Sequence, residues 1–462
     1  MSVTVAGIST RDVLQALGKA ITGFGLSGPG EDSFSSVVTD SRRARPGCLF
    51  VALKGQRADG HNFASQALAQ GARGLLLEKP VDLDPAAPRP TTFLVDNTLN
   101  ALQRLATYWR EKHEARVVGV TGSVGKSSTK ELIASVLSVR YQVLKSEGNL
   151  NTEVGLPLVL LNLDDTTQQV VLEMGMYGPG EIRQLCQIAR PQVGVITNVG
   201  HSHLERLGTL EAIAQAKAEL VEALPEEGVA ILNGDDPLVR AMAAGSRARV
   251  LLYGLDHALD LWAEDVESRG LEGVSFLLRY EQSKVTVRVR LLGRHSVHTA
   301  LAAAAVGLVE GLTWEEIGAG LEKAQEFRLL PTPGLRGSLI IDDTYNASPS
   351  STLAALDLLK ELQGRRIAVL GDMRELGLYE VEGHLRVGRR AAQVVDLLLV
   401  VGEMAALAGK EAEAAGTRVI FASSREEASA KLLSILQSGD VVLVKGSRAM
   451  EMEEIVERLR EK

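Results

Sequence analysis

The chain has 462 residues, of which 45% are hydrophobic and only 4% aromatic. This length favours several domains over a single core, and the composition favours Leu-, Val- and Ala-rich α/β layers. A formal net charge of −8 without a basic run argues against nucleic acid or an anionic membrane surface as partners. The two cysteines, Cys48 and Cys186, are too few for a disulfide framework, so we expect buried thiols in a reducing cytosol.

The sequence predicts neither a targeting segment nor a membrane span. Residues 1–18 lack a basic region followed by a long apolar run, so we expect no signal peptide. The longest apolar stretch, residues 299–312, is too short to cross a bilayer and contains Glu310. We therefore expect a soluble, cytoplasmic protein that does not insert into a membrane.

The first two domains are predicted from a change of pattern near residue 115. A Pro- and Asp-rich connection at 78–92 and a helical pattern at 100–115 end the first domain, which we place at residues 1–114. Strands then alternate with helices such as residues 210–224, which predicts a parallel sheet in a central domain at residues 115–327. Its strands are predicted at residues 117–121, 169–175, 193–200 and 228–236, and residues 285–293 indicate part of an antiparallel flap.

Pro and Gly cluster at residues 327–337, and beyond them a C-terminal domain is predicted at residues 328–462. Five apolar strands alternate with helices there, which is typical of a doubly wound, Rossmann-like sheet. Ligands bind such sheets beyond the carboxyl ends of the strands. The polar residues at those ends are Asp342, Asp343, Asp372 and Lys445.

A glycine loop between an apolar strand and a helix predicts a phosphate site. Gly122 and Gly125 let backbone N–H groups approach an anion, Lys126 adds a positive charge, and the Ser127 hydroxyl can ligate Mg²⁺. The shorter motif GxxGK[ST] is satisfied, whereas the longer GxxxxGK[ST] is not, because position 120 is Val. The alternative is a glycine turn with a chance lysine.

Two further strand ends carry residues of the metal-ligand type. The carboxylate of Glu173 could share a metal with Ser127, and His203 could bind a second cation. The alternatives are a glutamate that caps a turn and a histidine on a polar surface. The Asn-rich loop at residues 146–157 suits a polar anionic ligand, although Asn-Gly pairs are also ordinary turn chemistry.

Together these pieces resemble the Mur ligase family, the ATP-dependent amino-acid or peptide ligases of bacterial cell-wall synthesis. The family-wide likeness rests on "TGSVGKSS", "EMG", "NVGHSHLERLG", "NGDDP" and "GRHSVHTALAAAAV". The stretches "DDTYNASPSS", "GDMRELG" and "VKGSRAMEMEE" resemble the member that adds a dipeptide. Residues 38–72 resemble the uridine-binding domain of the family.

The resemblance implies a reaction, its substrates and its cofactors. ATP would convert a carboxylate into an acyl phosphate, which an amine attacks to give an amide, ADP and phosphate. The implied substrates are UDP-N-acetylmuramoyl-tripeptide and D-alanyl-D-alanine, and the implied cofactors are ATP and two Mg²⁺ ions. The first domain would bind the UDP end, the centre would bind ATP, and the C-terminal domain would close on ATP and bind the dipeptide. We expect a monomer.

The resemblance also implies roles for individual residues. ATP would contact Gly122, Ser123, Gly125, Lys126, Ser127, Ser128, Thr299, Arg328 and Asp343. The metal and catalytic residues would be Ser127, Glu173, His203 and Lys217, together with Lys126. The substrates would contact Ser41, Arg42, Asn149, Asn151, Thr152, Asn346, Arg374, Lys445 and Arg448.

Lys217 is implied to be a carbamylated lysine. An amine cannot ligate Mg²⁺, but a carbamate formed with CO₂ supplies the anionic oxygen that this ion prefers. The reaction with CO₂ needs a neutral amine, which partial burial favours. The alternative is a solvated lysine on a helix.

The chain departs from the family pattern at four positions. Ser296 and Thr299 stand where asparagines associated with the adenine ring are usual, so we expect looser base discrimination. Thr152 and Ser348 also replace common asparagines.

Two other functions remain open at this point. One is a related ligase that adds another amino acid or acts on folate-type substrates. The other is a P-loop ATPase switch, which would need neither a uridine domain nor a dipeptide site.

Overall fold

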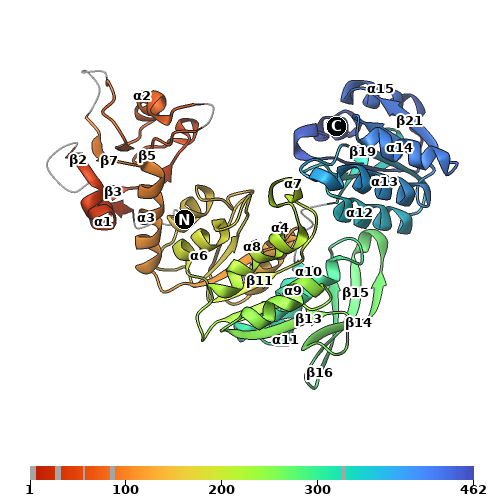
Figure 1. Ribbon diagram of the computed structural model, residues 1–462, viewed down its shortest axis with the longest axis horizontal. Helices are drawn as coiled ribbons and strands as arrows, with labels where there is room; N and C mark the ends of the chain where they lie inside the picture. Colours follow the sequence, from red (N-terminus) through yellow and green to blue (C-terminus); the bar gives the residue numbers. More distant parts are fainter. Residues whose placement is uncertain (1–6, 27–32, 56–57, 84–88, 324–328, 462) are drawn as a thin grey trace. The chain divides into compact units, whose positions relative to one another are not determined.

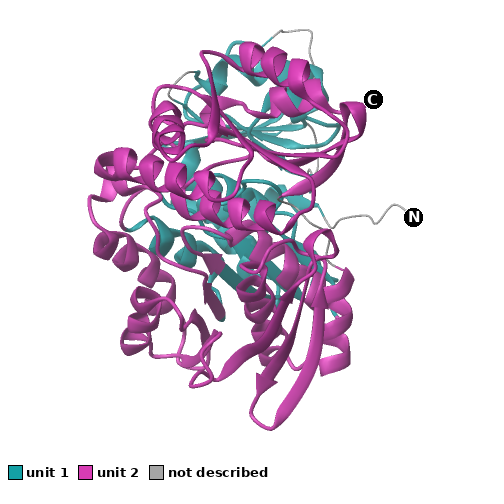
Figure 2. Cartoon of the chain, turned by 90° about the vertical axis from the view of Figure 1, so that its right-hand side faces the viewer, with its two compact units in different colours: residues 1–119, 141–176, 180–192 teal, residues 120–140, 177–179, 193–462 magenta. Residues whose placement is uncertain are grey.

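The computed structural model describes residues 7–26, 33–55, 58–83, 89–323 and 329–461. The chain divides into two compact units (Figure 2). Unit 1 comprises residues 1–119, 141–176 and 180–192, and unit 2 comprises residues 120–140, 177–179 and 193–462. This division does not test the predicted boundaries at 114/115 and 327/328, which stay predictions.

The N-terminal part of unit 1 is a five-stranded sheet in the order β2-β7-β6-β5-β4. Strands β4 to β7 are parallel, and β2 joins the edge antiparallel. The strands are β2 (Ile21–Gly25), β4 (Val37–Val38), β5 (Leu49–Val51), β6 (Gly74–Leu77) and β7 (Thr91–Val95). The short helix α2 (Ala64–Ala69) packs Ala64 and Ala67 against Phe50 and Leu75, and the buried thiol of Cys48 lies in the same cluster.

The rest of unit 1 holds the predicted Asn-rich loop. Strands β9 (Val143–Lys145) and β10 (Gln169–Glu173) are parallel, and β10 is buried along its whole length. Helix α3 (Thr98–Glu111) packs against α5 (Gly155–Leu160) and α6 (Glu181–Ala189). Trp109 of α3 donates to the Leu163 carbonyl at 3.0 Å, which ties α3 to the segment after α5.

The first part of unit 2 continues the predicted strand–helix alternation. Strands β11 to β14 are parallel neighbours, and β15 and β16 follow antiparallel, which confirms the predicted flap. Their bounds are β11 (Val193–Ile196), β12 (Val229–Asn233), β13 (Arg249–Gly254), β14 (Leu261–Ser268), β15 (Val274–Tyr280) and β16 (Ser283–Val289). The phosphate-loop helix α4 (Lys126–Leu137) packs on α10 (Ser296–Val309), whose six central residues 300–305 are five alanines and one leucine, all buried.

The C-terminal part of unit 2 is a six-stranded sheet in the order β17-β18-β22-β19-β20-β21. Its five parallel strands confirm the prediction of a doubly wound sheet: β18 (Ser338–Asp343), β19 (Arg365–Gly371), β20 (Leu397–Val401), β21 (Arg418–Ala422) and β22 (Asp440–Lys445). Helices α12 (Pro349–Glu361), α13 (Glu380–Ala392) and α14 (Ala405–Ala414) cover one face of this sheet. Helices α15 (Arg425–Ile435) and α16 (Glu453–Leu459) cover the other (Figure 1).

The sixth strand, β17 (Leu330–Gly334), was not predicted, because its sequence "LPTPG" has the composition of a connection. It pairs antiparallel with β18 at the edge of the sheet. Proline lacks the N–H that a central strand must donate, but an edge strand can accommodate it. Pro331 and Pro333 are therefore compatible with this position.

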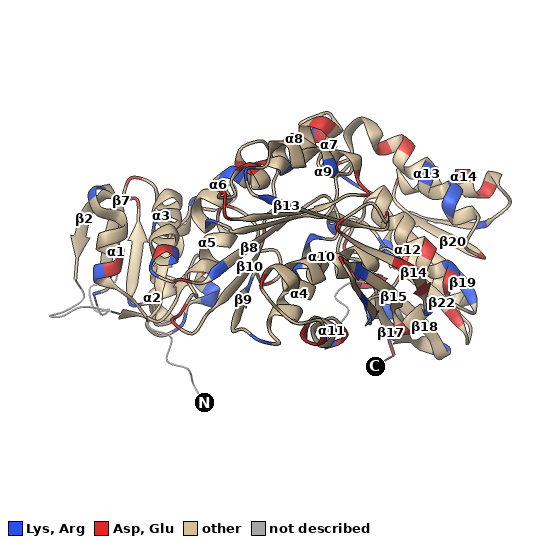
Figure 3. Cartoon of the chain, turned by 90° about the horizontal axis from the view of Figure 1, so that it is seen from below, with Lys and Arg blue, Asp and Glu red and all other residues tan. Residues whose placement is uncertain are grey.

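Charged side chains of both signs are interleaved on the C-terminal helices α13 and α14 (Figure 3). Arg389 contacts both Glu382 and Glu411 there. Side chains of such exposed pairs are solvated, and each pair contributes little to stability.

Candidate functional site

The predicted phosphate loop lies between β8 (Arg116–Thr121) and α4. Gly125 is the N-cap of α4 at φ +85°, and no side chain caps the first turn. Gly122 has φ +150°, and a Cβ atom there would collide with the Thr197 hydroxyl. Both glycines are therefore required by the backbone, and the N–H groups of the first helical turn are suited to an anion.

Residues after β11 hold this loop in shape. The Thr197 hydroxyl donates to the Val124 carbonyl at 2.7 Å, and the Asn198 side chain accepts from the Val124 N–H at 2.9 Å. Ser123 donates to the Gly200 carbonyl at 3.1 Å and accepts from the Gly200 N–H at 2.8 Å. Sequence reasoning had interpreted this stretch as metal-binding and missed its role in supporting the loop.

The predicted lysine of the loop is folded back on it. Lys126 donates to the Gly122 carbonyl at 2.9 Å, and its Nζ also lies 3.4 Å from the Ser123 carbonyl. Ser127 and Ser128 follow in the first turn of α4 and are half-buried. The loop thus brings together the predicted ATP residues from Gly122 to Ser128.

Lys217, on α8 (Leu210–Glu222), is one of the largest fully buried side chains in the described part of the chain, with 2% exposure. Burial lowers its pKa well below the usual value, and the charge of Lys126 lowers it further. The simple alternative of a solvated helix lysine is therefore wrong. Its environment favours a neutral amine.

Two of the predicted residues of unit 1 contact each other. The Asn151 amide donates to the Glu173 carboxylate at 2.8 Å, and the Glu173 N–H donates to the Ser146 hydroxyl at 3.1 Å. Glu173 is buried at the end of β10, as predicted. The Asn151 N–H donates to the Asn149 carbonyl at 2.8 Å, and Thr152 accepts from the Gly155 N–H at 3.3 Å.

His203 contacts a residue that sequence reasoning did not predict for the site. Its Nδ1 lies 3.1 Å from a carboxylate oxygen of Glu375, although the two are not aligned as a hydrogen bond. This contact is the main cause of a lowered pKa at Glu375. The Tyr177 ring packs edge-on against the His203 ring, with centroids 5.6 Å apart.

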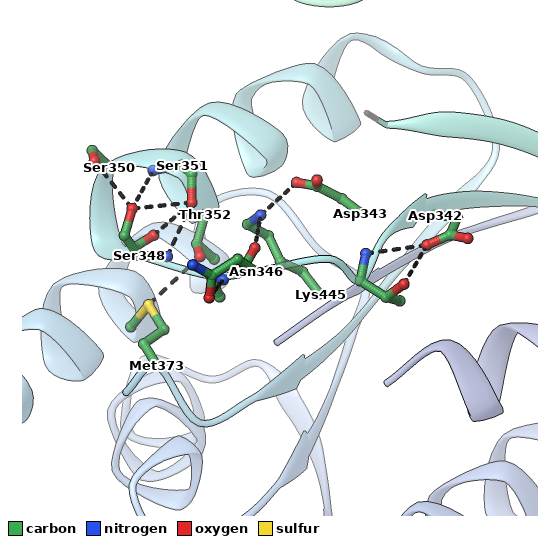
Figure 4. A network of polar contacts seen from close by, with 11 residues as sticks. Asp342, Asp343, Asn346, Ser348, Ser350, Ser351, Thr352, Met373 and Lys445 are labelled. Atoms are coloured by element: carbon green, nitrogen blue, oxygen red, sulfur yellow. Dashed lines mark hydrogen bonds and ion pairs between the residues drawn. The ribbon is translucent and has the colours of Figure 1, made fainter. Parts of the chain in front are cut away.

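Three of the predicted C-terminal residues, Asp343, Asn346 and Lys445, lie close together at the carboxyl ends of two neighbouring strands of the six-stranded sheet (Figure 4). Asp343 ends β18 and Lys445 ends the neighbouring β22, in direct register. The Lys445 amine donates to Asp343 at 2.6 Å and to the Asn346 carbonyl at 2.8 Å. The departure at Ser348 has a structural explanation, because its side chain caps α12 by accepting from the Ser351 N–H.

The two predicted arginines lie on the loops after β19 and β22. Arg374 bonds Asp372 at 2.7 Å through its guanidinium and Ser447 at 2.7 Å through its N–H. Arg448 bonds Glu453 at 2.8 Å and lies over the Tyr345 ring. Their side chains are about half exposed or more, which leaves both accessible to a ligand.

The two predicted residues for the UDP end behave differently. The Ser41 side chain is buried and donates to Gln66 at 2.9 Å. The Arg42 side chain is exposed and pairs with Asp40 at 2.7 Å. Of the predicted ATP residues outside the phosphate loop, Thr299 is half-buried on α10, and Arg328 lies outside the described residues.

Among the described ranges, no three His, Cys, Asp or Glu side chains converge on a point that would hold a metal ion. The predicted set of Ser127, Glu173, His203 and Lys217 is compatible with this result, because a hydroxyl, nucleotide phosphates and a lysine carbamate would supply the remaining oxygens. Helices long and apolar enough to cross a membrane are also absent from the described residues.

Three family models match the chain. The Mur ligase family catalytic domain matches residues 33–110, the Mur ligase middle domain residues 120–307, and the Mur ligase glutamate ligase domain residues 328–448. The chain is 39% identical to the UDP-N-acetylmuramoyl-tripeptide–D-alanyl-D-alanine ligase of Escherichia coli, over 93% of this chain and 94% of that protein. It is 38% identical to the Bacillus subtilis enzyme of the same name, over 92% and 93%.

Solved structures of Mur ligases are similar in fold to this chain. MurF from Acinetobacter baumannii superposes with a TM-score of 0.89 at 32% identity, covering 100% of both chains. The ADP complex of MurF ligase from Thermotoga maritima superposes with a TM-score of 0.79 at 33% identity, covering 92% of this chain and 96% of that one.

Proposed function

The chain belongs to the Mur ligase family, and we propose that it joins D-alanyl-D-alanine to UDP-N-acetylmuramoyl-tripeptide at the expense of ATP. The relatives at 38–39% identity carry that activity in their names, and a structural neighbour binds ADP. The observation that carries the proposal is the cluster of Asp343, Asn346 and Lys445 at the carboxyl edge of the C-terminal sheet. It lies in the stretches that resemble the dipeptide-adding member.

ATP activates the carboxylate of the acceptor peptide. The phosphate loop binds the nucleotide through backbone N–H groups, with Lys126 and the hydroxyls of Ser123, Ser127 and Ser128 around the phosphates. Lys126 leaves its loop carbonyls to meet the negative charge that develops on the transferred phosphoryl group. The resulting acyl phosphate is attacked by the amine of the dipeptide, which releases phosphate and forms the amide.

Magnesium supplies charge neutralisation on the phosphates and on the transferred group. The residues that would hold it are Ser127, Glu173, His203 and a carbamylated Lys217. Support for the carbamate comes from the complete burial of Lys217 and from its lowered pKa, because only a neutral amine reacts with CO₂.

The remaining assigned residues would bind the substrates. Ser41 and Arg42 would bind the UDP end, and Asn149, Asn151 and Thr152 would bind the muramoyl peptide. Asp343 would bind the ribose of ATP. Asn346, Arg374, Lys445 and Arg448 would bind the dipeptide, whose carboxylate suits the two arginines. We expect the enzyme to act as a monomer in the cytoplasm.

ATP turnover tests the proposal. ADP should form at a substantial rate only when UDP-N-acetylmuramoyl-tripeptide and D-alanyl-D-alanine are both present, and the amide product should match it mole for mole. ATP hydrolysis that ignores both substrates would indicate a P-loop switch instead. Turnover with a single amino acid in place of the dipeptide would indicate a related ligase.

A further inference from the structure

The chain lacks the two asparagines expected beside adenine, and the structure explains one of the replacements. Ser296 is buried, and its hydroxyl donates at 2.7 Å to the carbonyl of Leu292, in the segment that leads into α10. That hydroxyl therefore serves the start of α10 rather than a base. The side chain that recognises the adenine base is therefore expected among the neighbours of Ser296.

His298 lies on the same first turn of α10 and is held by a carboxylate. Its Nε2 lies 2.7 Å from an Asp235 oxygen, and the Leu255 N–H donates to the same oxygen at 2.7 Å. Both side chains keep an accessible part, with 29% and 26% exposure. The pair is thus fixed in place yet open to a ligand.

A chain of hydrogen bonds connects this pair to the phosphate loop. Asp235 follows β12, and the next residue, Asp236, accepts from the Val199 N–H at 2.8 Å. Asn233, at the end of β12, donates to the Thr197 carbonyl at 2.8 Å, and Thr197 in turn bonds the loop residue Val124. The pair and the loop therefore lie at the carboxyl ends of strands in one part of the sheet.

His295 lies close to this pair and also to Asp343, the residue assigned to the ribose. The pKa of His295, one turn before His298, is lowered by desolvation of its ring, although the residue as a whole is exposed. The charge of Asp343 opposes this shift, and the charges of Lys445 and His298 add to it. The charges of Asp343 and His298 both act on His295, which places each of them near His295. Under the proposed function, a nucleotide with its phosphates on the loop and its ribose at Asp343 would have its base at the start of α10, beside His298.

We propose that His298, oriented by Asp235, reads the 6-position of the adenine base. An ionised carboxylate can only accept, so Nε2 of His298 carries the hydrogen that points to Asp235. In the neutral ring, Nδ1 then presents a lone pair. That lone pair accepts from the 6-amino group of adenine and opposes the 6-oxo group of guanine or hypoxanthine.

Asp235 is suited to fixing this tautomer. Burial raises its pKa, but the hydrogen bonds from His298 and the Leu255 N–H outweigh burial, so the pKa lies below its usual value. The carboxylate is therefore ionised at neutral pH. His298 is a specificity residue in this scheme, and Asp235 is a positioning residue.

The test compares three nucleotides whose purines differ at the 6-position: ATP, inosine triphosphate, whose 6-oxo base also carries a hydrogen on N1, and purine riboside triphosphate. The complete enzyme should bind ATP about tenfold more tightly than the purine riboside form, the equivalent of one hydrogen bond, and inosine triphosphate most weakly. In His298→Ala these three affinities should converge. Asp235→Asn should also weaken the preference for ATP. An asparagine side chain can both donate and accept a hydrogen bond, so it no longer fixes one tautomer of His298. His257→Ala, at an exposed histidine that also lies beside an aspartate, is the matched control and should keep the wild-type preference.

Melting temperatures establish that each variant is folded. An unchanged ATP preference in folded His298→Ala would overturn the assignment. An equal loss of affinity for all three nucleotides would do the same, because it would mean a structural role for His298.

Discussion

Lys445 and Asp343 end adjacent strands of the C-terminal sheet and form a buried ion pair, with Nζ 2.6 Å from the carboxylate. Their side chains are 2% and 10% exposed. The lysine also bonds the Asn346 carbonyl, so it fixes the start of the loop that leads into α12. Both residues were predicted to bind ligands, and this contact means that each also positions the other.

A double-mutant cycle should separate those two roles. Lys445→Met leaves the Asp343 charge buried and unpaired, which should lower the free energy of unfolding by about 3–5 kcal/mol. Lys445→Met combined with Asp343→Asn should recover most of that loss, because no buried charge remains. Ligation should stay lost in both variants, since both side chains are assigned to substrates. Denaturant unfolding measures the stability, and a Lys445→Met protein of wild-type stability would contradict the buried-pair description.

Lys126→Ala should abolish ligation with little loss of stability. In the structure the half-buried amine donates to two carbonyls of its own loop, so the side chain contributes to the phosphate site rather than to the core. The variant should retain its melting temperature within the few degrees typical of a surface change. Exposed Lys323 on α11 (Trp314–Lys323) supplies the control, since Lys323→Ala should keep both activity and stability. A folded Lys126→Ala enzyme with wild-type turnover would remove the loop from the mechanism.

The sequence predicted the features that depend on short stretches of chain. The phosphate loop was identifiable because Gly122, Gly125 and Lys126 must stand in fixed order between a strand and a helix. The doubly wound C-terminal sheet was identifiable because five apolar strands alternate with helices. The edge strand β17 was missed because Pro331 and Pro333 do not favour a strand locally.

Local sequence patterns could not predict contacts that depend on the order of strands in a sheet. Strand β22 inserts between β18 and β19, and only this order brings Lys445 to Asp343. In the same way, the partner of His203 lies more than 170 residues further along the chain, at Glu375. The pairing of His298 with Asp235 likewise joins a helix start to a distant strand end.

Glu375 should influence metal binding through His203. Its carboxylate lies 3.1 Å from Nδ1 of the ring, which leaves Nε2 for a cation, and we expect metal binding to bring the two groups into the hydrogen bond by which carboxylates orient metal-binding histidines. The Glu375 backbone is in a left-handed conformation at φ +64°, and its carbonyl accepts from the Glu205 N–H at 3.4 Å. Nearby, the rings of His201 and Tyr379 stack with centroids 3.8 Å apart. The segment is therefore held against the histidine at several points.

Glu375→Gly should weaken Mn²⁺ binding about tenfold or more in the presence of a non-hydrolysable ATP analogue. Its stability should not fall much, because glycine relieves a left-handed conformation that costs other residues about 1 kcal/mol. Titration calorimetry measures the metal affinity directly. Glu382→Gly is a poor comparison because it lies within a helix, so Glu382→Ala, at an exposed pair, is the control and should leave the affinity unchanged. Wild-type Mn²⁺ affinity in Glu375→Gly would show that the carboxylate does not orient the histidine.

Lys217→Ala should lose most ligase activity, and a short carboxylate should restore part of it. The side chain is fully buried on α8, where burial, and then the charge of Lys126, lower the pKa of the amine well below its usual value. If CO₂ converts that amine into a carbamate, the alanine variant loses an anionic oxygen donor and keeps a space of matching size. Acetate or propionate can enter such a space and offer the same carboxylate oxygens to magnesium.

Lys410→Ala, at an exposed lysine of α14, is the control and should neither lose activity nor respond to the added acid. The decisive measurement is turnover at limiting magnesium, with and without the carboxylate. Full activity of Lys217→Ala under those conditions would mean that the buried amine has no part in holding the metal.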